Sequence, residues 1–224
     1  MTAVDLAPLA LSLQVAVLAT LVAAIAGVGL ATLLATARFP GRDLVDVLAT
    51  APMVLPPTVL GYYLLVALGR HAALGRAFEA VFGTPIVFTR VGAVVAASVG
   101  ALPLVVKSSR AALEGVDATL VQAARTLGAA PARAFVTVQL PLAARGIVAS
   151  LILAFARSLG DFGITLMVAG DIPGETQTAS LALYDAIQEH REAAALEMAL
   201  TLTAVAIAIL YGVGKLTARS ARGA

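Results

Sequence analysis

Between Asp5 and Arg38 the chain has 32 consecutive residues without a charged side chain. A helix needs about 20 largely apolar residues to cross the hydrocarbon core of a bilayer, so this run can span a membrane with margin for tilt. The run is much longer than the apolar core of a signal peptide, and no Lys or Arg precedes it. We therefore expect a membrane helix that is retained in the mature chain.

The rest of the sequence is also suited to a bilayer. Hydrophobic residues make up 60% of the 224 residues and charged residues only 12%, whereas an average soluble domain has about 45–50% apolar and about 25% charged residues. Four further apolar segments are long enough to span a membrane: residues 47–68, 85–106, 142–169 and 193–213. The sequence thus predicts an all-α membrane protein with about five transmembrane helices.

Basic residues predict how the chain is oriented, because cytoplasmic loops carry an excess of Lys and Arg. With an external amino terminus, the segments 38–46, 107–145 and 215–224 are cytoplasmic and carry two, five and three Lys or Arg residues, ten in total. The external segments then carry four: Arg70, Arg76, Arg90 and Arg191. This distribution predicts a multi-pass protein of the inner membrane, with the amino terminus outside and the carboxy terminus in the cytoplasm.

The longest predicted cytoplasmic loop has the composition of short helices but lacks a wide apolar stripe. Residues 122–127 predict one short helix that ends at Gly128, because glycine tolerates the left-handed conformation of a helix C-terminus. Pro131 suits the first turn of a second helix, where its missing N–H group costs nothing. Two short helices joined at a glycine form an elbow, and small side chains there let another protein approach closely. Alternatively, the loop is only a connector between two spans.

The spacing of residues in this loop resembles a known signature. Three residues separate Gln122-Ala123-Ala124 from Gly128, nine more separate Gly128 from Val138, and one separates Val138 from Leu140-Pro141. This pattern resembles the Glu-Ala-Ala loop of ABC importer permeases, with Gln in place of Glu and Val in place of Ile. The resemblance implies a coupling helix that lies in a groove of a cytoplasmic ATPase, although the Gln removes a charge that could pair with that ATPase. The implied coupling loop consists of Gln122, Ala123, Ala124, Gly128, Leu140 and Pro141.

Three further stretches resemble the permease subunit of molybdate importers: APMVLPPTVLGYYLL, LEGVDATLVQAARTLGA and FARSLGDFGITLMVAGDIPGETQT. The resemblance covers about residues 9–214, which would form one permease domain of the type I ABC importer fold, followed by a short cytoplasmic tail at 215–224. It implies ATP-driven import of molybdate, or of tungstate, by alternating access. The implied partners are a second copy of the chain, cytoplasmic ATPase subunits, and a periplasmic or lipid-anchored molybdate-binding protein.

The resemblance also implies that this chain binds no cofactor itself, since ATP and Mg²⁺ would be bound by the separate ATPase. Two alternatives remain open. The chain could be a permease for sulfate or another tetrahedral oxyanion, or a membrane scaffold or sensor that keeps the loop but transports nothing. An ATPase that copurifies with the chain would distinguish a transporter from a scaffold.

Two pairs of residues inside the predicted spans are candidates for the transport pathway or its gate. Pro56 and Pro57 remove two backbone hydrogen bonds in mid-span, which is tolerated where the freed carbonyls face protein or a water-filled cavity. Arg157 and Asp161 are four residues apart on one helical face, and charges at membrane depth usually face the bundle interior or a wet cavity. Each pair has a structural alternative: a simple bend for the prolines, and an ion pair that fixes helix packing for the charges.

Several classes of function find no support in the sequence. The chain has no cysteine and only two histidines, so thiolate catalysis and a histidine-rich metal site are not expected. The acidic residues Glu189, Glu192 and Glu197 lie at a predicted external helix start, where solvated charge is expected. The sequence shows no phosphate-binding glycine loop, no serine paired with a base, and no basic patch interleaved with aromatic residues. We therefore expect neither enzymatic activity nor nucleic-acid binding.

Overall fold

The structure, a computed structural model, describes residues 6–220, with side chains for residues 6–212 and Lys215. Every regular element within that range is helical, which confirms the predicted all-α fold. In chain order the elements are α1 (Ala7–Thr36), α2 (Arg42–Thr50), the 3-10 turn η1 (Ala51–Met53), α3 (Pro57–Leu68), α4 (Ala73–Phe82), α5 (Arg90–Glu114), α6 (Ala118–Thr126), α7 (Pro131–Ala134), the π-helical stretch η2 (Phe135–Gln139), α8 (Leu140–Leu159), α9 (Gly163–Ala169), α10 (Ala179–Gln188) and α11 (Glu192–Ser220).

Within the described residues, four helical segments are long and apolar enough to cross a membrane: Ala7–Thr36, Arg90–Glu114, Pro131–Leu159 and Glu192–Gly212. A fifth candidate is the pair formed by Arg42–Met53 and Pro57–Leu68, whose two halves are bent by 114°. We call this the bent pair. The predicted set of about five spans therefore corresponds to four single helical segments and one bent pair.

Small residues let the long helices pack closely. Buried alanines and Gly27 form one face of α1, and a Cβ added to Gly27 would lie 2.8 Å from Val105 Cγ1 of α5. Between α5 and α8, the buried hydroxyls of Ser109 and Ser150 lie 3.0 Å apart and share a hydrogen bond. Close backbone approach and hydrogen bonds between helices stabilise bundles in lipid, where hydrophobic association between helices is weak.

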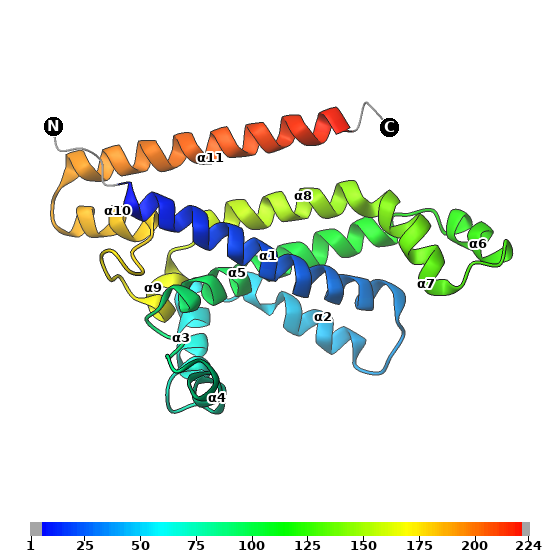
Figure 1. The fold of residues 1–224 in the computed structure, drawn as a ribbon, viewed down its shortest axis with the longest axis horizontal. Helices are drawn as coiled ribbons and strands as arrows, with labels where there is room; N and C mark the ends of the chain where they lie inside the picture. The colour runs from blue at the N-terminus through cyan, green and yellow to red at the C-terminus, as the bar shows by residue number, and fades with distance from the viewer. Residues whose placement is uncertain (1–5, 221–224) are drawn as a thin grey trace.

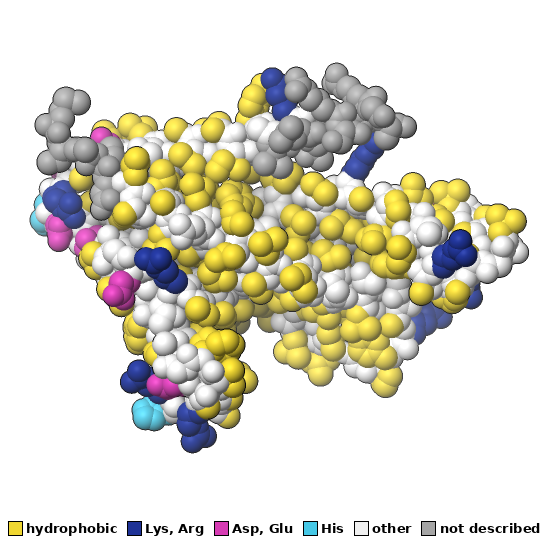
Figure 2. All heavy atoms as spheres, viewed as in Figure 1, with side chains coloured by type: hydrophobic (Ala, Val, Ile, Leu, Met, Phe, Trp, Pro, Cys, Tyr) yellow, Lys and Arg dark blue, Asp and Glu magenta, His cyan; other side chains and the backbone are white. Residues whose placement is uncertain are grey.

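Figure 1 shows α1, α5, α8 and α11 running along the long axis of the molecule, with α6 and α7 protruding at one end. The α3–α4 hairpin projects sideways nearer the opposite end. In Figure 2, apolar side chains cover the flanks of the long helices, while charged side chains gather toward the ends of the molecule and on the α3–α4 hairpin. This distribution is expected for a protein whose middle lies in hydrocarbon and whose ends lie in water.

Two predicted spans differ from the structure. The prolines predicted to bend the middle of one span do lie at the 114° bend of the bent pair, but the helix is interrupted there and a new one begins, with Pro56 as the N-cap of α3 and Pro57 as its first residue. Proline fits this place because the N–H groups of a first helical turn have no partner within the helix. The span predicted at 142–169 ends at Leu159, since Gly160 leaves helical geometry and α9 begins separately. Asp161 therefore lies in a break after α8 and does not share a helix with Arg157.

Other helix ends also differ from the predicted bounds. The span predicted at 85–106 starts at Arg90, because the Thr89 hydroxyl accepts a hydrogen bond from the Gly92 N–H and caps α5, and it continues to Glu114. The predicted tail at 215–224 begins inside α11, which continues to Ser220, and residues 221–224 lie outside the described range.

Candidate functional site

The predicted ATPase-coupling loop forms α6, a turn and α7 at one end of the molecule (Figure 1). Asp117 caps α6: its carboxylate accepts a hydrogen bond from the Thr119 backbone N–H at 2.8 Å, which lowers the pKa of Asp117. On α6, Gln122 and Ala123 are exposed and Ala124 is half-buried. The small residues selected from the sequence thus lie at or near the surface of this segment.

Gly128 forms the elbow between α6 and α7. Its φ of +91° is in the left-handed region, and its N–H donates to Arg125 O at 3.0 Å at the end of α6. No described atom lies within 4 Å of the position that a Cβ would take, so the space beside Gly128 is open. Leu127, next to it, is 89% exposed and places a large apolar side chain at the elbow. Leu127 was not selected from the sequence, although an apolar residue directly before an elbow glycine is a usable signal.

The two ends of the segment meet at the last turn of α5. The Gln139 side chain donates from Nε2 to Leu113 O at 3.1 Å. Leu140 is the first residue of α8 and packs against the apolar cluster around Leu113, and Pro141 is the second residue of α8. These two signature residues therefore start the helix that carries the chain back into the bundle. Beside them, α6, α7, η2 and the end of α1 line an open groove of about 590 Å³.

The second candidate site lies where α8 ends and α9 begins. Arg157 Nη1 donates to Asp161 Oδ1 at 2.8 Å, and Asp161 Oδ2 accepts from the Thr165 N–H at 3.0 Å and from its hydroxyl at 2.6 Å. The Asp161 side chain is 2% exposed and the Arg157 side chain 35%. On α5, Gly100 faces the pair and the first turn of α9, and a Cβ there would lie 2.8 Å from Ile164 Cδ1. Asp161 thus caps the first turn of α9 while Arg157 balances its charge.

The bent pair reaches the same place. A Cβ on Gly163, the first residue of α9, would lie 2.9 Å from Pro57 Cβ, so the start of α3 contacts the start of α9. The structure therefore brings Pro57 close to Asp161 and Arg157, which the sequence selects separately, with Pro56 adjacent in the chain. Both prolines are exposed.

A group of charged residues not selected from the sequence joins α2 to α5. Arg110 Nη1 lies 3.0 Å from Asp46 Oδ2, and Arg110 Nε donates to Glu114 Oε1 at 2.7 Å. Lys107 Nζ donates to both carboxylate oxygens of Asp46 at 3.1 Å, and Arg42 Nη2 lies 3.5 Å from Glu114 Oε1. Spacings of three and four residues place each helix's members on one face, but only the fold shows which two helices pair. We call this set the α2–α5 charge network; its members are Arg42, Asp46, Lys107, Arg110 and Glu114.

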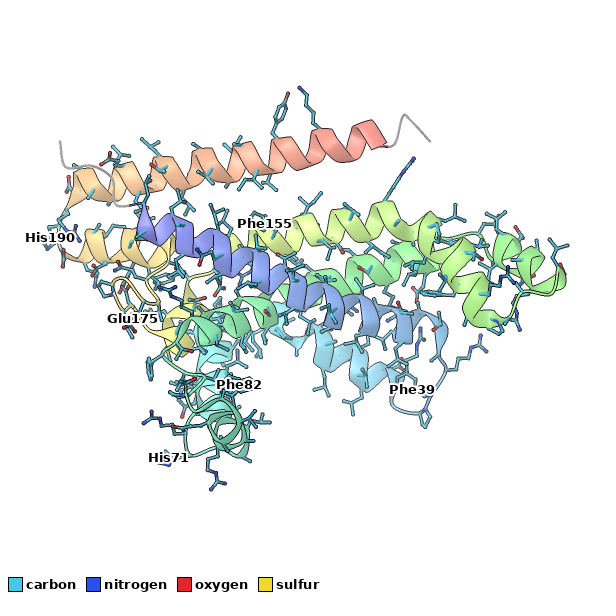
Figure 3. The ribbon with its side chains drawn as sticks, viewed as in Figure 1. Phe39, His71, Phe82, Phe155, Glu175 and His190 are labelled. Atoms are coloured by element: carbon cyan, nitrogen blue, oxygen red, sulfur yellow. The ribbon has the colours of Figure 1, made fainter. Side chains whose placement is uncertain are left out.

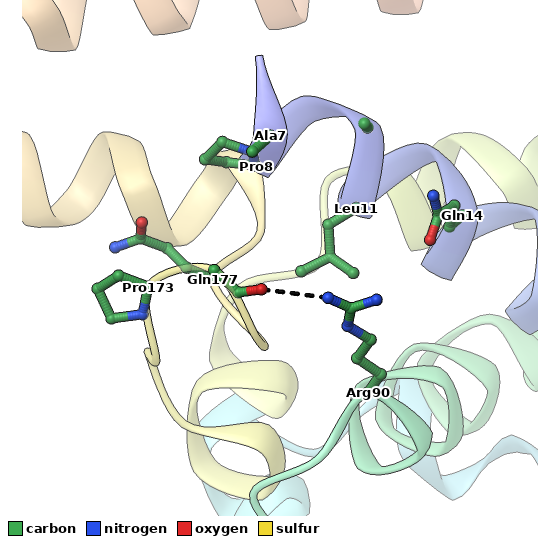
Figure 4. Close-up of a pocket in the computed structure, with 9 residues that line it drawn as sticks. Ala7, Pro8, Leu11, Gln14, Arg90, Pro173 and Gln177 are labelled. Carbon is green, nitrogen blue, oxygen red and sulfur yellow. Dashed lines mark hydrogen bonds between the residues drawn. The ribbon is translucent and has the colours of Figure 1, made fainter. Parts of the chain in front are cut away.

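At the opposite end of the bundle, Arg90 lines a cavity of about 230 Å³ between the start of α1 and the loop that precedes α10 (Figure 4). Its Nε donates to Glu175 O at 3.0 Å and its Nη2 to Gly174 O at 3.1 Å. These bonds attach the loop to the first turn of α5. The described residues that line this cavity include none of those selected from the sequence.

The described residues contain no group of three or more His, Cys, Asp or Glu residues placed to hold a metal ion. The two histidines lie far apart, with His71 in the α3–α4 connection and His190 between α10 and α11 (Figure 3).

Comparison with known proteins places these features in a family. Residues 23–222 match the family described as "Binding-protein-dependent transport system inner membrane component". The molybdenum transport system permease protein ModB of Escherichia coli strain K12 is 49% identical over 178 residues, covering 80% of this chain and 78% of that protein. The sulfate transport system permease protein CysT of Salmonella typhimurium is 32% identical over 211 residues, covering 94% of this chain and 76% of that protein.

Solved structures share the fold. A bacterial ABC transporter involved in the import of the acidic polysaccharide alginate has a TM-score of 0.78 at 13% identity, covering 98% of this chain and 80% of that chain. At this identity the likeness shows the fold alone. Together with the family match it confirms the resemblance seen in the sequence, and the chain belongs to the family of inner-membrane components of binding-protein-dependent transport systems.

Proposed function

We propose that this chain is the permease subunit of an ATP-driven importer for molybdate, with tungstate as an alternative cargo. The observation that carries the proposal is the 49% identity to ModB of E. coli, a protein named for molybdenum transport. Molybdate and tungstate are tetrahedral dianions of the same shape and charge, so a passage suited to one is suited to the other.

The α6–α7 segment supports an ATP-driven mechanism. We infer that it faces the cytoplasm, where the excess of Lys and Arg places it, and that it docks in a groove of a separate ATPase. Gln122, Ala123 and the apolar tip at Leu127 are exposed for that contact. When ATP closes the ATPase pair, the docked segments move and the pathway opens outward to receive the anion. Hydrolysis returns it inward, and ATP and Mg²⁺ remain with the ATPase.

The pathway is assigned to the surface near the α8–α9 break. About a third of the Arg157 side chain is exposed there, and its charge attracts an anion, while buried Asp161 holds it in place. Exposed Pro56 and Pro57 lie nearby, where the start of α3 contacts the start of α9. A second copy of the chain facing this surface would enclose a passage between the two subunits.

The α3–α4 hairpin supports assembly with a second copy. It projects from the bundle (Figure 1), and large apolar and aromatic side chains on it are exposed. A partner subunit would cover side chains that the isolated chain leaves bare, and a periplasmic or lipid-anchored binding protein would deliver the anion at this end. The most exposed of these side chains are Tyr62, Tyr63, Val66, Leu74, Val81 and Phe82.

Sulfate import is the second candidate, because CysT of S. typhimurium is 32% identical over 94% of this chain. The identity to ModB is higher, at 49%, which favours molybdate over sulfate as the cargo.

Uptake of labelled molybdate, tungstate and sulfate tests the proposal, in a deletion strain that carries this chain with its own ATPase and binding protein. We expect molybdate and tungstate to accumulate and sulfate to remain outside. Preferential accumulation of sulfate would assign the chain to the second candidate. A chain that binds no ATPase and moves none of the three anions would instead be a scaffold or sensor.

A further inference from the structure

The α2–α5 charge network forms a continuous path in which the charges alternate in sign. Asp46 lies between Lys107 and Arg110, and Glu114 lies between Arg110 and Arg42. The side chains range from 20% exposed for Arg110 to 48% exposed for Lys107, so the network lies at the border between the bundle and water. A single exposed ion pair contributes little to stability, but linked pairs with good geometry fix the relative position of two helices more firmly.

The network also attaches α2 to the end of α1. Arg42 Nε donates to Leu34 O at 2.8 Å, in the last turn of α1. Beneath the charges, Leu34 packs with Ala49 of α2 and Val106 of α5 in one apolar cluster. α2 is therefore held along its length by α1 and α5, and its carboxyl end leads through η1 to the 114° bend.

The α6–α7 segment is attached to the last turn of α5. Glu114 is the last residue of α5, and Asp117, three residues later, caps α6. At the far end of the segment, Gln139 bonds to Leu113 O. A displacement of α6 and α7 therefore acts directly on the last turn of α5, where Glu114 contacts Arg42 of α2, and Arg110, one turn earlier, contacts Asp46.

A second route leads from the segment through α8, which ends at the Arg157–Asp161 pair. The route through α5 and α2 arrives at the same place, because Pro57 at the start of α3 lies against Gly163 of α9. The two routes converge at the start of α9. They must move in step if α9 is to keep both sets of contacts.

We propose that the α2–α5 charge network transmits the movement of the α6–α7 segment to the bent pair, so that α2 and α5 move as one body during the transport cycle. This inference rests on the proposed function, since it requires a cycle driven by an ATPase. Asp46 is the positioning residue, because it is the acid on α2 that contacts two cations of α5.

Asp46→Asn removes the acidic charge that α2 contributes to the network, with little change in side-chain size. The variant should insert, bind its ATPase and hydrolyse ATP, but import about ten-fold less molybdate per ATP, which is the scale of typical coupling between sites. Asp43→Asn is the matched control, because Asp43 is an exposed acid of the same helix that lies outside the network. The control variant should import as much molybdate per ATP hydrolysed as the unmodified chain. Asp46→Glu restores the carboxylate and should recover most of the molybdate import per ATP.

A distance measurement separates transmission from a purely structural role. The sequence has no cysteine, so spin labels can be attached at Leu44→Cys on α2 and Ala111→Cys on α5, both of which are exposed. In the purified complex with its ATPase, the label separation should be equal with and without trapped nucleotide. In Asp46→Asn it should differ between the two states. Should Asp46→Asn fail to assemble, Lys107→Gln at the exposed edge of the network takes its place.

Two outcomes overturn the inference: an unaltered ratio of molybdate to ATP in the Asp46 variant, or a label separation that responds to nucleotide in the same way with and without the Asp46 charge. Failure of the proposed function looks different, because the unmodified complex would then import no oxyanion in the same assay.

Discussion

Arg157 Nη1 and Asp161 Oδ1 lie 2.8 Å apart across the end of α8, although the two residues do not share a helix. Asp161 also caps α9 through the N–H and hydroxyl of Thr165. The ion pair therefore fixes the angle at which the chain leaves one helix and enters the next. A structural role and a pathway role are compatible here, and variants can separate them.

Arg157→Met should leave a buried carboxylate without its cation and lower the stability of the purified complex by about 2 kcal/mol, the size of a charged hydrogen bond. Combining it with Asp161→Asn should recover much of that loss, because no unpaired charge remains and the amide oxygen can still accept from the Thr165 N–H and hydroxyl. Thermal unfolding measures both effects, with Arg157→Lys as the control that keeps the charge. If the pair also serves the pathway, the double variant will be stable yet import molybdate poorly. Normal stability and uptake in both variants would contradict either role.

Local chemistry explains the parts of the fold that could be predicted from the sequence. The uncharged run before Arg38 is long enough to span a bilayer whatever it packs against. The end of α6 at Gly128 and the start of α7 at Pro131 depend on backbone conformations that these two residues favour on their own. The elbow between α6 and α7 was therefore predictable residue by residue.

Tertiary contacts explain the parts that could not be predicted. Pro56 and Pro57 predict a bend, but its angle of 114° and the start of a separate helix at Pro57 depend on the packing of α3 against α9. The spacing of Arg157 and Asp161 suits an intact helix, yet the chain breaks at Gly160, where Asp161 can cap the next helix. The α2–α5 charge network requires knowledge of which helices are neighbours.

Gly146→Ala should destabilise the protein by about 1–3 kcal/mol, the usual cost of overpacking a core. The added Cβ would lie 2.5 Å from Ala112 Cβ, and neither methyl group can rotate away, so α5 and α8 must separate. Gly29→Ala is the matched control, because it lies inside α1 and no described atom is within 4 Å of its Cβ position. Thermal unfolding of the two variants compares them, and equal midpoints would show that α5 and α8 do not pack this closely.

Single cysteines test the predicted orientation, since the chain has none of its own. Leu127→Cys at the elbow and His71→Cys in the α3–α4 connection are both at exposed positions. A thiol reagent that cannot cross the inner membrane should label the residue 71 variant in intact cells, and the residue 127 variant only after the membrane is opened. Labelling of the elbow from outside would invert the orientation inferred from ten Lys and Arg on one side and four on the other.

Asp171 should make stability depend on pH. Burial raises the pKa of the Asp171 carboxyl above its ordinary value. A hydrogen bond with the Gln177 side chain lowers this pKa in part, and the negative charge of Asp185 raises it further. The folded state then holds the proton more tightly than the unfolded state, so stability falls as pH rises from the ordinary carboxyl pKa to the raised value. Asp171→Asn should therefore be more stable than the unmodified chain at neutral pH, and the difference should vanish in acid.

Unfolding midpoints of the purified protein between about pH 3.5 and 8 check this, a range that includes the ordinary carboxyl pKa. Glu175→Gln, an exposed acid of the same loop, is the control and should shift the midpoints little. An Asp171→Asn variant that is less stable at neutral pH would show that the carboxylate is stabilising in its charged form.

Gly128 should be required for coupling and not only for folding. Both Gly128, with φ of +91°, and Gly41, with φ of +86°, are left-handed glycines with no described atom within 4 Å of a Cβ position. Alanine at either position should cost about 1–2 kcal/mol of backbone strain, so Gly41→Ala controls for strain outside the coupling segment. Both variants should insert, because the five candidate spans are untouched.

The two glycine variants should differ in ATPase function. Gly128→Ala, and more strongly Gly128→Leu, should lose either copurification of the ATPase or the link between ATP turnover and molybdate uptake, because an added side chain blocks close approach of the partner. Gly41→Ala should keep both. Copurification, turnover stimulated by the loaded binding protein, and uptake can be measured with the same set of strains, which separates failed assembly from failed coupling. If Gly128→Leu assembles, responds to the binding protein and imports molybdate at the unmodified rate, residues 122–141 are not the coupling segment.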